Sequence, residues 1–99
     1  MKATLIPGLE WSTWSKHLFA RDHVTVLHVW REATHVAHHK AEVWRFRRDG
    51  RTLYEAYVMA GAYGVTEYLR QEFDSARAAR QAVEKAVLRA IQDGAMQRN

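Results

Sequence analysis

Basic side chains are most concentrated in the segment from position 40 to position 51, where two aromatic residues, Trp44 and Phe46, alternate with them. The basic residues of this segment are Lys40, Arg45, Arg47, Arg48 and Arg51. Such side chains contact phosphate oxygens, aromatic rings stack on bases, and a two-stranded ribbon can enter the major groove of DNA. The segment therefore favours nucleic acid as a ligand. The alternative is a charged hairpin that protects a sheet edge while its aromatic rings face the core.

Histidines form a second group. His35, His38 and His39 stand at spacings of three and four, between the carboxylates Glu32 and Glu42. Neutral imidazoles at these spacings converge on one metal ion if the stretch is helical. The pattern matches no recognised ligand motif, which favours a polar loop. We therefore expect neither a metal site nor another cofactor.

No group of nucleophiles or acids predicts an enzyme. The chain has no cysteine, which removes thiol chemistry, disulfides and cysteine-based zinc sites. No serine stands in a nucleophile elbow, no glycine-rich phosphate loop occurs, and the 11 carboxylates are scattered. A pocket lined by Trp11, Trp14, Trp30 and tyrosines is a further possibility for a small apolar ligand, although core packing is the commoner role of such residues.

The length and composition indicate one small domain. The 99 residues, 47% of them hydrophobic, suit a single core, with positions 1–8 as an N-terminal arm or short strand and 95–99 as a frayed tail. The net charge of +4 favours acidic partners. Because no apolar run reaches the roughly 20 residues of a membrane span and no signal-peptide core precedes Pro7, we expect a cytoplasmic protein without a membrane partner.

The apolar pattern predicts an α+β fold, in which a long C-terminal helix packs on an antiparallel sheet of about four strands. A short N-terminal helix is expected from Leu9 to Ala20, because Trp11, Trp14 and Leu18 fall on one helical stripe. Segments rich in β-branched and aromatic residues are the predicted strands. The expected strands are His23–Arg31, Lys40–Arg47, Arg51–Ala60 and Val65–Phe73, with Glu32–His39 as a polar connection.

The turn near Gly50 decides which side chains share a face of the sheet. We favour a three-residue loop, Arg48-Asp49-Gly50, over a two-residue Asp-Gly turn, because it separates aromatic from charged positions more cleanly. In that register one face carries Trp44, Phe46, Tyr54, Ala56 and Val58. The other face carries Val43, Arg45, Arg47, Leu53, Glu55 and Tyr57.

The C-terminal helix is expected from Ser75 to Gln92. Asp74 or Ser75 is suited to its N-cap and Gly94 to its end. Its apolar stripe consists of Ala76, Ala79, Val83, Ala86, Val87 and Ala90. The residues expected to face outward are Arg77, Gln81, Glu84, Lys85 and Arg89, with Leu88 among them.

The join between the last strand and this helix, residues 73–82, resembles two known kinds of domain. Ser75, Arg77, Ala79, Arg80 and Ala82 are similar to the last helix of double-stranded-RNA-binding domains. The join also looks like that of the three-stranded DNA-binding domains of tyrosine integrases. The similarity covers less than a fifth of the chain, and the Gly-Pro-x-His-type loop of the RNA-binding family is absent. Arg77 and Arg80 are secondary candidates for contacts with nucleic acid.

One helix covers only one face of a sheet. Unless the short tryptophan helix covers the second face, we expect that face to form an interface, and a two-fold homodimer is the commonest arrangement. The candidate interface residues are Leu27, Val29, Val43, Leu53, Tyr57, Met59 and Leu88. We therefore expect a dimeric, non-enzymatic domain that binds DNA or RNA. The alternatives are a protein-interaction module, such as an accessory or regulatory factor of a mobile element, and a small-molecule binder.

Overall fold

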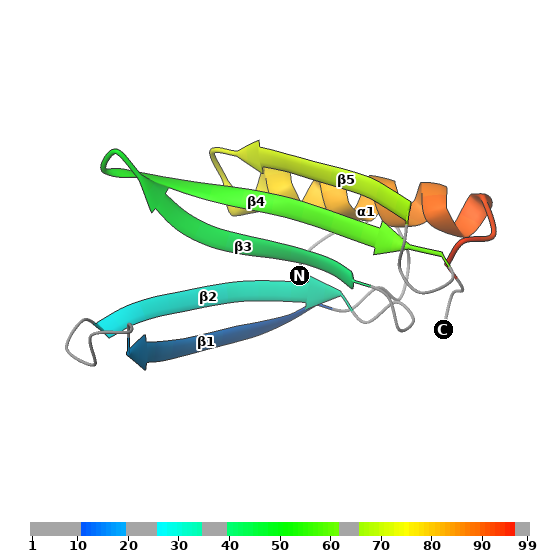
Figure 1. Ribbon diagram of the computed structural model, residues 1–99. Coiled ribbons are helices and arrows are strands. Elements are labelled where there is room, and N and C mark those ends of the chain that lie inside the picture. The colour runs from blue at the N-terminus through cyan, green and yellow to red at the C-terminus, as the bar shows by residue number, and fades with distance from the viewer. Residues whose placement is uncertain (1–10, 20–25, 35–39, 62–65, 97–99) are drawn as a thin grey trace.

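The computed structural model describes residues 11–19, 26–34, 40–61 and 66–96. Its elements are β1 (Trp11–Phe19), β2 (Val26–Thr34), β3 (Lys40–Arg48), β4 (Arg51–Ala60), β5 (Thr66–Phe73) and α1 (Ala76–Gln92). Each strand pairs antiparallel with its neighbour in the chain, which gives one sheet in the order β1-β2-β3-β4-β5 (Figure 1). The prediction of an α+β fold with an antiparallel sheet and a C-terminal helix is confirmed.

The predicted N-terminal helix is wrong, because residues 11–19 form β1 and the described sheet has five strands rather than about four. Serine, threonine, tryptophan and histidine dominate this segment, and these residues are weak helix formers. The segment instead pairs with β2 along its whole length, from Trp11 opposite Thr34 to Phe19 opposite Val26. β2 also extends to Thr34, so that Glu32–Thr34, expected in a connection, belong to the sheet.

The preferred three-residue loop is also wrong. Arg48 pairs with Arg51, so the turn consists of Asp49 and Gly50 alone. Both residues have positive φ angles, 51° and 76°. Two-residue turns of this kind match the right-handed twist of the strands, and Asp-Gly is among the sequences that adopt them most readily. The register is therefore shifted by one position, which exchanges the faces of the β3 side chains relative to those of β4.

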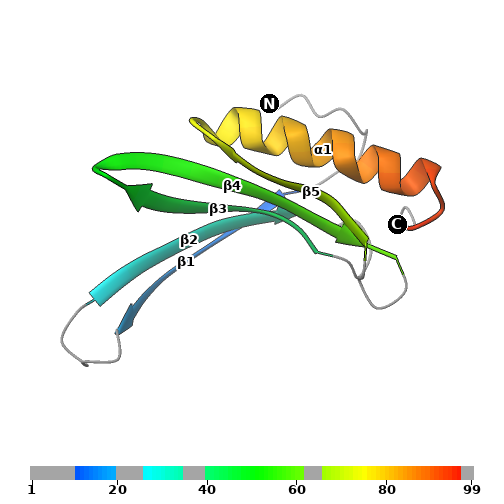
Figure 2. The same cartoon turned by 45° about the horizontal axis from the view of Figure 1, so that its top comes forward.

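In the observed register, small apolar side chains face α1 and form the core. The strands contribute Ala41, Val43, Ala56, Val58 and Ala60. The helix contributes Ala79, Val83, Ala86, Val87 and Ala90, and Met96 joins them after it. These short side chains let the helix lie close to the sheet, and α1 contacts β3, β4 and β5. Figure 2 shows α1 over these three strands, with β1 and β2 extending beyond it.

The ends of α1 are those that the sequence predicts. The Ser75 hydroxyl accepts a hydrogen bond from the Ala78 amide at 3.1 Å, which caps the first turn. Gly94 follows the last turn with a φ of 75°. The prediction that Glu84 faces outward is wrong, because this residue is only 4% exposed. Within the described ranges, no helix has both the length and the apolar character that a membrane span requires.

The sheet consists of two unequal parts. The helix-covered region comprises β3, β4, β5 and α1, and the β1–β2 ribbon comprises the first two strands. Among the described residues, β2 and β3 pair at four positions, Trp30–Ala33 with Glu42–Arg45. Beyond this stretch the ribbon diverges from the β3–β4 hairpin (Figures 1 and 2). The ribbon therefore depends on a short junction for its attachment.

Candidate functional site

The face of the sheet opposite α1 carries no covering element in the described part of the chain (Figure 2). We name it the open face. Side chains on one face of a sheet belong to alternate positions along each strand and to the partners opposite them. By this rule the register assigns to the open face Trp14, Arg31, Trp44, Phe46, Arg48, Tyr57 and Arg70. The register also assigns the carboxylates of Glu42, Glu55 and Glu72 to this face, so aromatic rings lie there among charges of both signs.

Three of these residues form a continuous row across β1, β2 and β3. Trp14 lies opposite Arg31, and Arg31 lies opposite Trp44. The Arg31 Cζ atom is 5.3 Å from the ring centroid of Trp14 and 5.4 Å from that of Trp44. Both distances lie within the range of a cation–π contact. We name this arrangement the Trp–Arg–Trp row.

Glu42 holds one end of this row in place. The indole N–H of Trp44 donates a hydrogen bond to Glu42 Oε1 at 3.0 Å. The second carboxylate oxygen, Oε2, lies 3.4 Å from Arg31 Nη1. The Arg31 Nε atom is buried and has no hydrogen-bond partner among the described residues. Glu42 thus joins the indole and the guanidinium in one polar cluster, while 38% of Trp14 at the other end of the row is exposed.

The same pairing of cation and ring recurs elsewhere on the open face. Arg48 Cζ lies 5.2 Å from the ring centroid of Phe46 on β3. Arg70 Cζ on β5 lies 4.9 Å from the ring centroid of Tyr57 on β4. Contacts between a guanidinium group and an aromatic ring therefore occur on both halves of the open face, at β1–β3 and at β4–β5.

The positive charge of the predicted basic hairpin is largely compensated by acidic side chains. Arg48 makes a bidentate pair with Glu72, with N–O distances of 2.8 and 2.9 Å. The hydrogen bonds from this guanidinium lower the pKa of the Glu72 carboxyl. The same contact raises the pKa of Arg48. Arg51 pairs with Asp74 at 2.9 Å. Arg47 donates to the Gly50 carbonyl at 2.8 Å and has no ion pair among the described residues.

The two ion pairs, Arg48–Glu72 and Arg51–Asp74, border an open hollow beside the start of α1. Its volume is about 540 Å³. The lining residues are Arg48, Asp49, Arg51, Leu53, Glu72, Phe73, Asp74, Ser75 and Ala78. Because Arg48 and Arg51 are paired with Glu72 and Asp74, the hollow presents charges of both signs.

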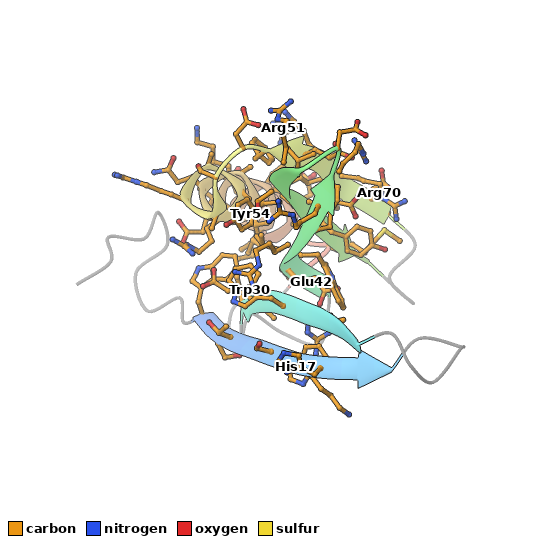
Figure 3. All side chains as sticks on the ribbon, turned by 90° about the vertical axis from the view of Figure 1, so that its left-hand side faces the viewer. His17, Trp30, Glu42, Arg51, Tyr54 and Arg70 are labelled. Atoms are coloured by element: carbon orange, nitrogen blue, oxygen red, sulfur yellow. The ribbon has the colours of Figure 1, made fainter. Side chains whose placement is uncertain are left out.

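Two other residues that were predicted to contact nucleic acid, Arg45 and Arg80, lie on the helix side of the sheet. Arg45 stacks on Trp30 at 5.1 Å, and Trp30 meets Tyr54 edge to face at 5.9 Å (Figure 3). Arg80 on α1 binds the buried Glu32 carboxylate at 2.6 Å. Neither guanidinium therefore belongs to the open face. Arg77, on α1, is exposed, and the side chain of Lys40 lies outside the described residues.

The predicted interface residues do not form one surface. Val43 is fully buried beneath α1, because the register shift moves it to the helix side. Leu53 is also buried, and Val29, Tyr57 and Met59 are partly buried. Leu88 is 38% exposed, on the helix. The side chain of Leu27 lies outside the described residues.

The tryptophans expected to line one pocket lie on opposite faces. The Trp11 indole N–H donates to Glu84 on α1 at 3.0 Å, whereas Trp14 lies on the open face. A separation of three residues has this effect in a strand, because successive side chains alternate. His35, His38 and His39 lie outside the described residues. The described ranges hold no group of three or more histidines and acidic residues that could bind a metal ion.

The Trp–Arg–Trp row was not predicted from the sequence. This row can be predicted only if residues 11–19 are assigned to a strand, because Trp14 then lies opposite Arg31. The second requirement was the Asp49-Gly50 turn, which places Trp44 on the face of Glu55 and not on the face of the core residues Ala56 and Val58. A comparison with protein-family models, curated proteins and solved structures finds no match for this chain.

Proposed function

We propose that the chain binds nucleic acid through the open face of its sheet. The observation that carries this proposal is the Trp–Arg–Trp row on a face without a covering element. Proteins that bind single strands combine aromatic side chains, on which bases stack, with cationic groups that follow the backbone. Guanidinium planes also stack on unpaired bases. The net charge of +4 agrees in sign with such a ligand. We propose that the protein binds nucleic acid in the cytoplasm and catalyses no reaction.

The row supplies the stacking surface in this proposal. Trp14 retains exposed ring area, and Glu42 fixes the orientation of the indole of Trp44. A ring held in place before binding loses little conformational freedom when a base stacks on it. Phe46 and Tyr57 extend the surface toward β4 and β5.

The hairpin tip supplies phosphate contacts. Arg47 is exposed and has no acidic partner among the described residues. Arg48 and Arg51 form ion pairs in which their side chains remain 55% and 69% exposed. Exposed ion pairs of this kind contribute little to stability, so a phosphate can replace the carboxylate at small cost. Arg45 and Arg80 are omitted from the proposed contacts because Arg45 stacks on Trp30 and Arg80 binds the buried Glu32 carboxylate.

The first test measures the stacking contribution. The affinity of fluorescently labelled single-stranded DNA, single-stranded RNA and duplex DNA is measured by anisotropy at low salt. Stacking of one base is worth about 1–3 kcal/mol, so Trp14→Ala should weaken binding by about fivefold or more. Leu88→Ala is the matched control, because Leu88 has the same 38% exposure but lies on the helix. Equal affinities of Trp14→Ala and wild type would contradict the proposed surface.

The second test measures the phosphate contribution. Arg47→Glu should weaken binding to every sequence and reduce the dependence of affinity on salt. Lys85→Glu makes the same change in net charge on the exposed side of α1 and should have a smaller effect. Failure of the wild-type chain to bind any of the three nucleic acids at low salt would overturn the proposal as a whole.

A further inference from the structure

The two edges of the sheet differ in how they resist pairing with another strand. β5 carries three charged side chains, Glu67, Arg70 and Glu72, and its pairing with β4 contains a register shift at Val58/Met59. Charges and bulges are devices by which natural proteins block an exposed edge. β5 is therefore a protected edge.

β1, at the other edge, has one charged side chain and no register shift in its pairing. Its nine residues pair with β2 without interruption, and Lys16 is its only charged side chain. The side chains from Ser12 to His17 are all exposed. A long, regular strand of this kind presents a row of backbone donors and acceptors to another strand.

From this contrast we infer that β1 pairs antiparallel with β1 of a second copy of the chain, which joins two five-stranded sheets across a two-fold axis. The surface differs from the interface expected from the sequence, which lay on a face of the sheet rather than on its edge. The inference also stands apart from the proposed function, because it concerns the free protein.

The sequence of β1 itself favours a second copy as the occupant. A symmetric antiparallel pair of strands is centred on one residue, and only a pair centred on Ser15 includes all nine positions of β1. In that register Lys16 of each copy lies opposite Trp14 of the other copy. A lysine beside an indole makes a favourable cation–π contact. A pair centred on Lys16 would instead set two lysines opposite each other, which is unfavourable.

The same register agrees with the rest of the open face. A two-fold axis between antiparallel strands is perpendicular to the sheet, so the open faces of the two copies lie on the same side. Lys16 of the second copy then continues the Trp–Arg–Trp row beyond Trp14. The backbone contributes about one hydrogen bond per residue pair along the new junction.

Cysteine cross-linking tests the register, because the chain contains no cysteine of its own. In the inferred dimer the two copies of residue 15 meet on the axis, within the range of a disulfide. Ser15→Cys should therefore cross-link under mild oxidation. Ser12→Cys is the matched control, since it is an exposed serine of the same strand. Its two copies would be six positions apart, about 20 Å, and should not cross-link.

The mass in solution tests the association itself. Light scattering without nucleic acid should give about 23 kDa, which is twice the 11.5 kDa of one chain. Ser15→Lys sets two charges on the axis and should lower the mass to that of a monomer. Gln71→Lys, at an exposed position on β5, should leave the dimer intact. A monomeric wild type, or cross-linking of Ser12→Cys as readily as Ser15→Cys, would overturn the inference.

Discussion

The helix-covered region and the β1–β2 ribbon belong to one sheet but are stabilised by different interactions. In the helix-covered region, alanine and valine side chains of β3, β4 and α1 are buried against one another. This core supplies the hydrophobic stabilisation of the described structure. The ribbon contributes mainly partly buried rings to it, among them Trp11 and Trp30.

Polar contacts join the ribbon to the helix. Arg80 binds Glu32 of β2 at 2.6 Å, and the Trp11 indole donates to Glu84 at 3.0 Å. Within the ribbon, the Thr13 hydroxyl donates to the second Glu32 oxygen at 3.4 Å. Glu32 and Glu84 are only 6% and 4% exposed. Buried carboxylates are costly unless they are paired, so these contacts make the attachment of the ribbon specific to one geometry.

Stability is therefore not uniform along this sheet. Regions with a dense apolar core open only on global unfolding, whereas those held by few contacts open locally. The ribbon also carries Trp14 and Arg31 of the proposed binding surface. Four predictions, in order of decreasing effect, test the contrast between the two regions.

The largest effect is expected in the core. Val83 is fully buried, and Val83→Asp would place an unpaired carboxylate there. We expect a loss of more than about 4 kcal/mol, enough to unfold a domain of this size. Circular dichroism during urea denaturation measures it. Lys85→Asp, two positions away on the exposed side of the helix, should cost less than about 1 kcal/mol; a similar loss in both variants would contradict the core assignment.

The next effect concerns the attachment of the ribbon. Glu32→Ala leaves the guanidinium of Arg80, 19% exposed, without its carboxylate. We expect a loss of about 3 kcal/mol in the free energy of unfolding. Glu67→Ala removes the acid of an exposed pair with Arg70 and should cost about 0.5 kcal/mol. If the two losses are equal, the Glu32–Arg80 pair does not hold the ribbon to the helix.

A smaller, local effect is expected from the Trp–Arg–Trp row. Trp14→Ala removes one ring from Arg31, a contact worth about 0.5–1 kcal/mol at an exposed site. Amide hydrogen exchange should become faster in β1 and β2 and stay unchanged in β4. Uniform acceleration in all strands would show that the ribbon and the helix-covered region open together.

The smallest effect is expected from the exposed Arg48–Glu72 pair. Because the pKa of Glu72 is lowered in the folded state, this pair stabilises the fold above the ordinary glutamate range. Its contribution is lost as the pH falls through the lowered pKa. Arg48→Gln should return the Glu72 pKa toward its ordinary value in an NMR titration. Arg51→Gln, which breaks the neighbouring pair with Asp74, should leave it low.

Local signals explain what could be predicted. The capping serine, Gly94 and the apolar stripe define α1 because helix boundaries depend on a few neighbouring residues. The β4 strand has its predicted limits, Arg51–Ala60, for a similar reason. The basic segment was identified from composition, but its charge compensation was not, because Glu72 and Asp74 lie more than 20 positions away from their arginines.

The residue pattern predicted an α+β domain with a C-terminal helix, a β-hairpin that turns near Gly50 and a basic segment at that hairpin. The assignment of residues 11–19 to a strand depends on long-range pairing, because this segment forms a strand along the whole length of β2. The tertiary structure also decided which face each side chain occupies. A shift of one residue in register moves every side chain of a strand to the other face. The local preference of Asp-Gly for a two-residue turn favoured the observed register, whereas the separation of aromatic from charged positions favoured the wrong one.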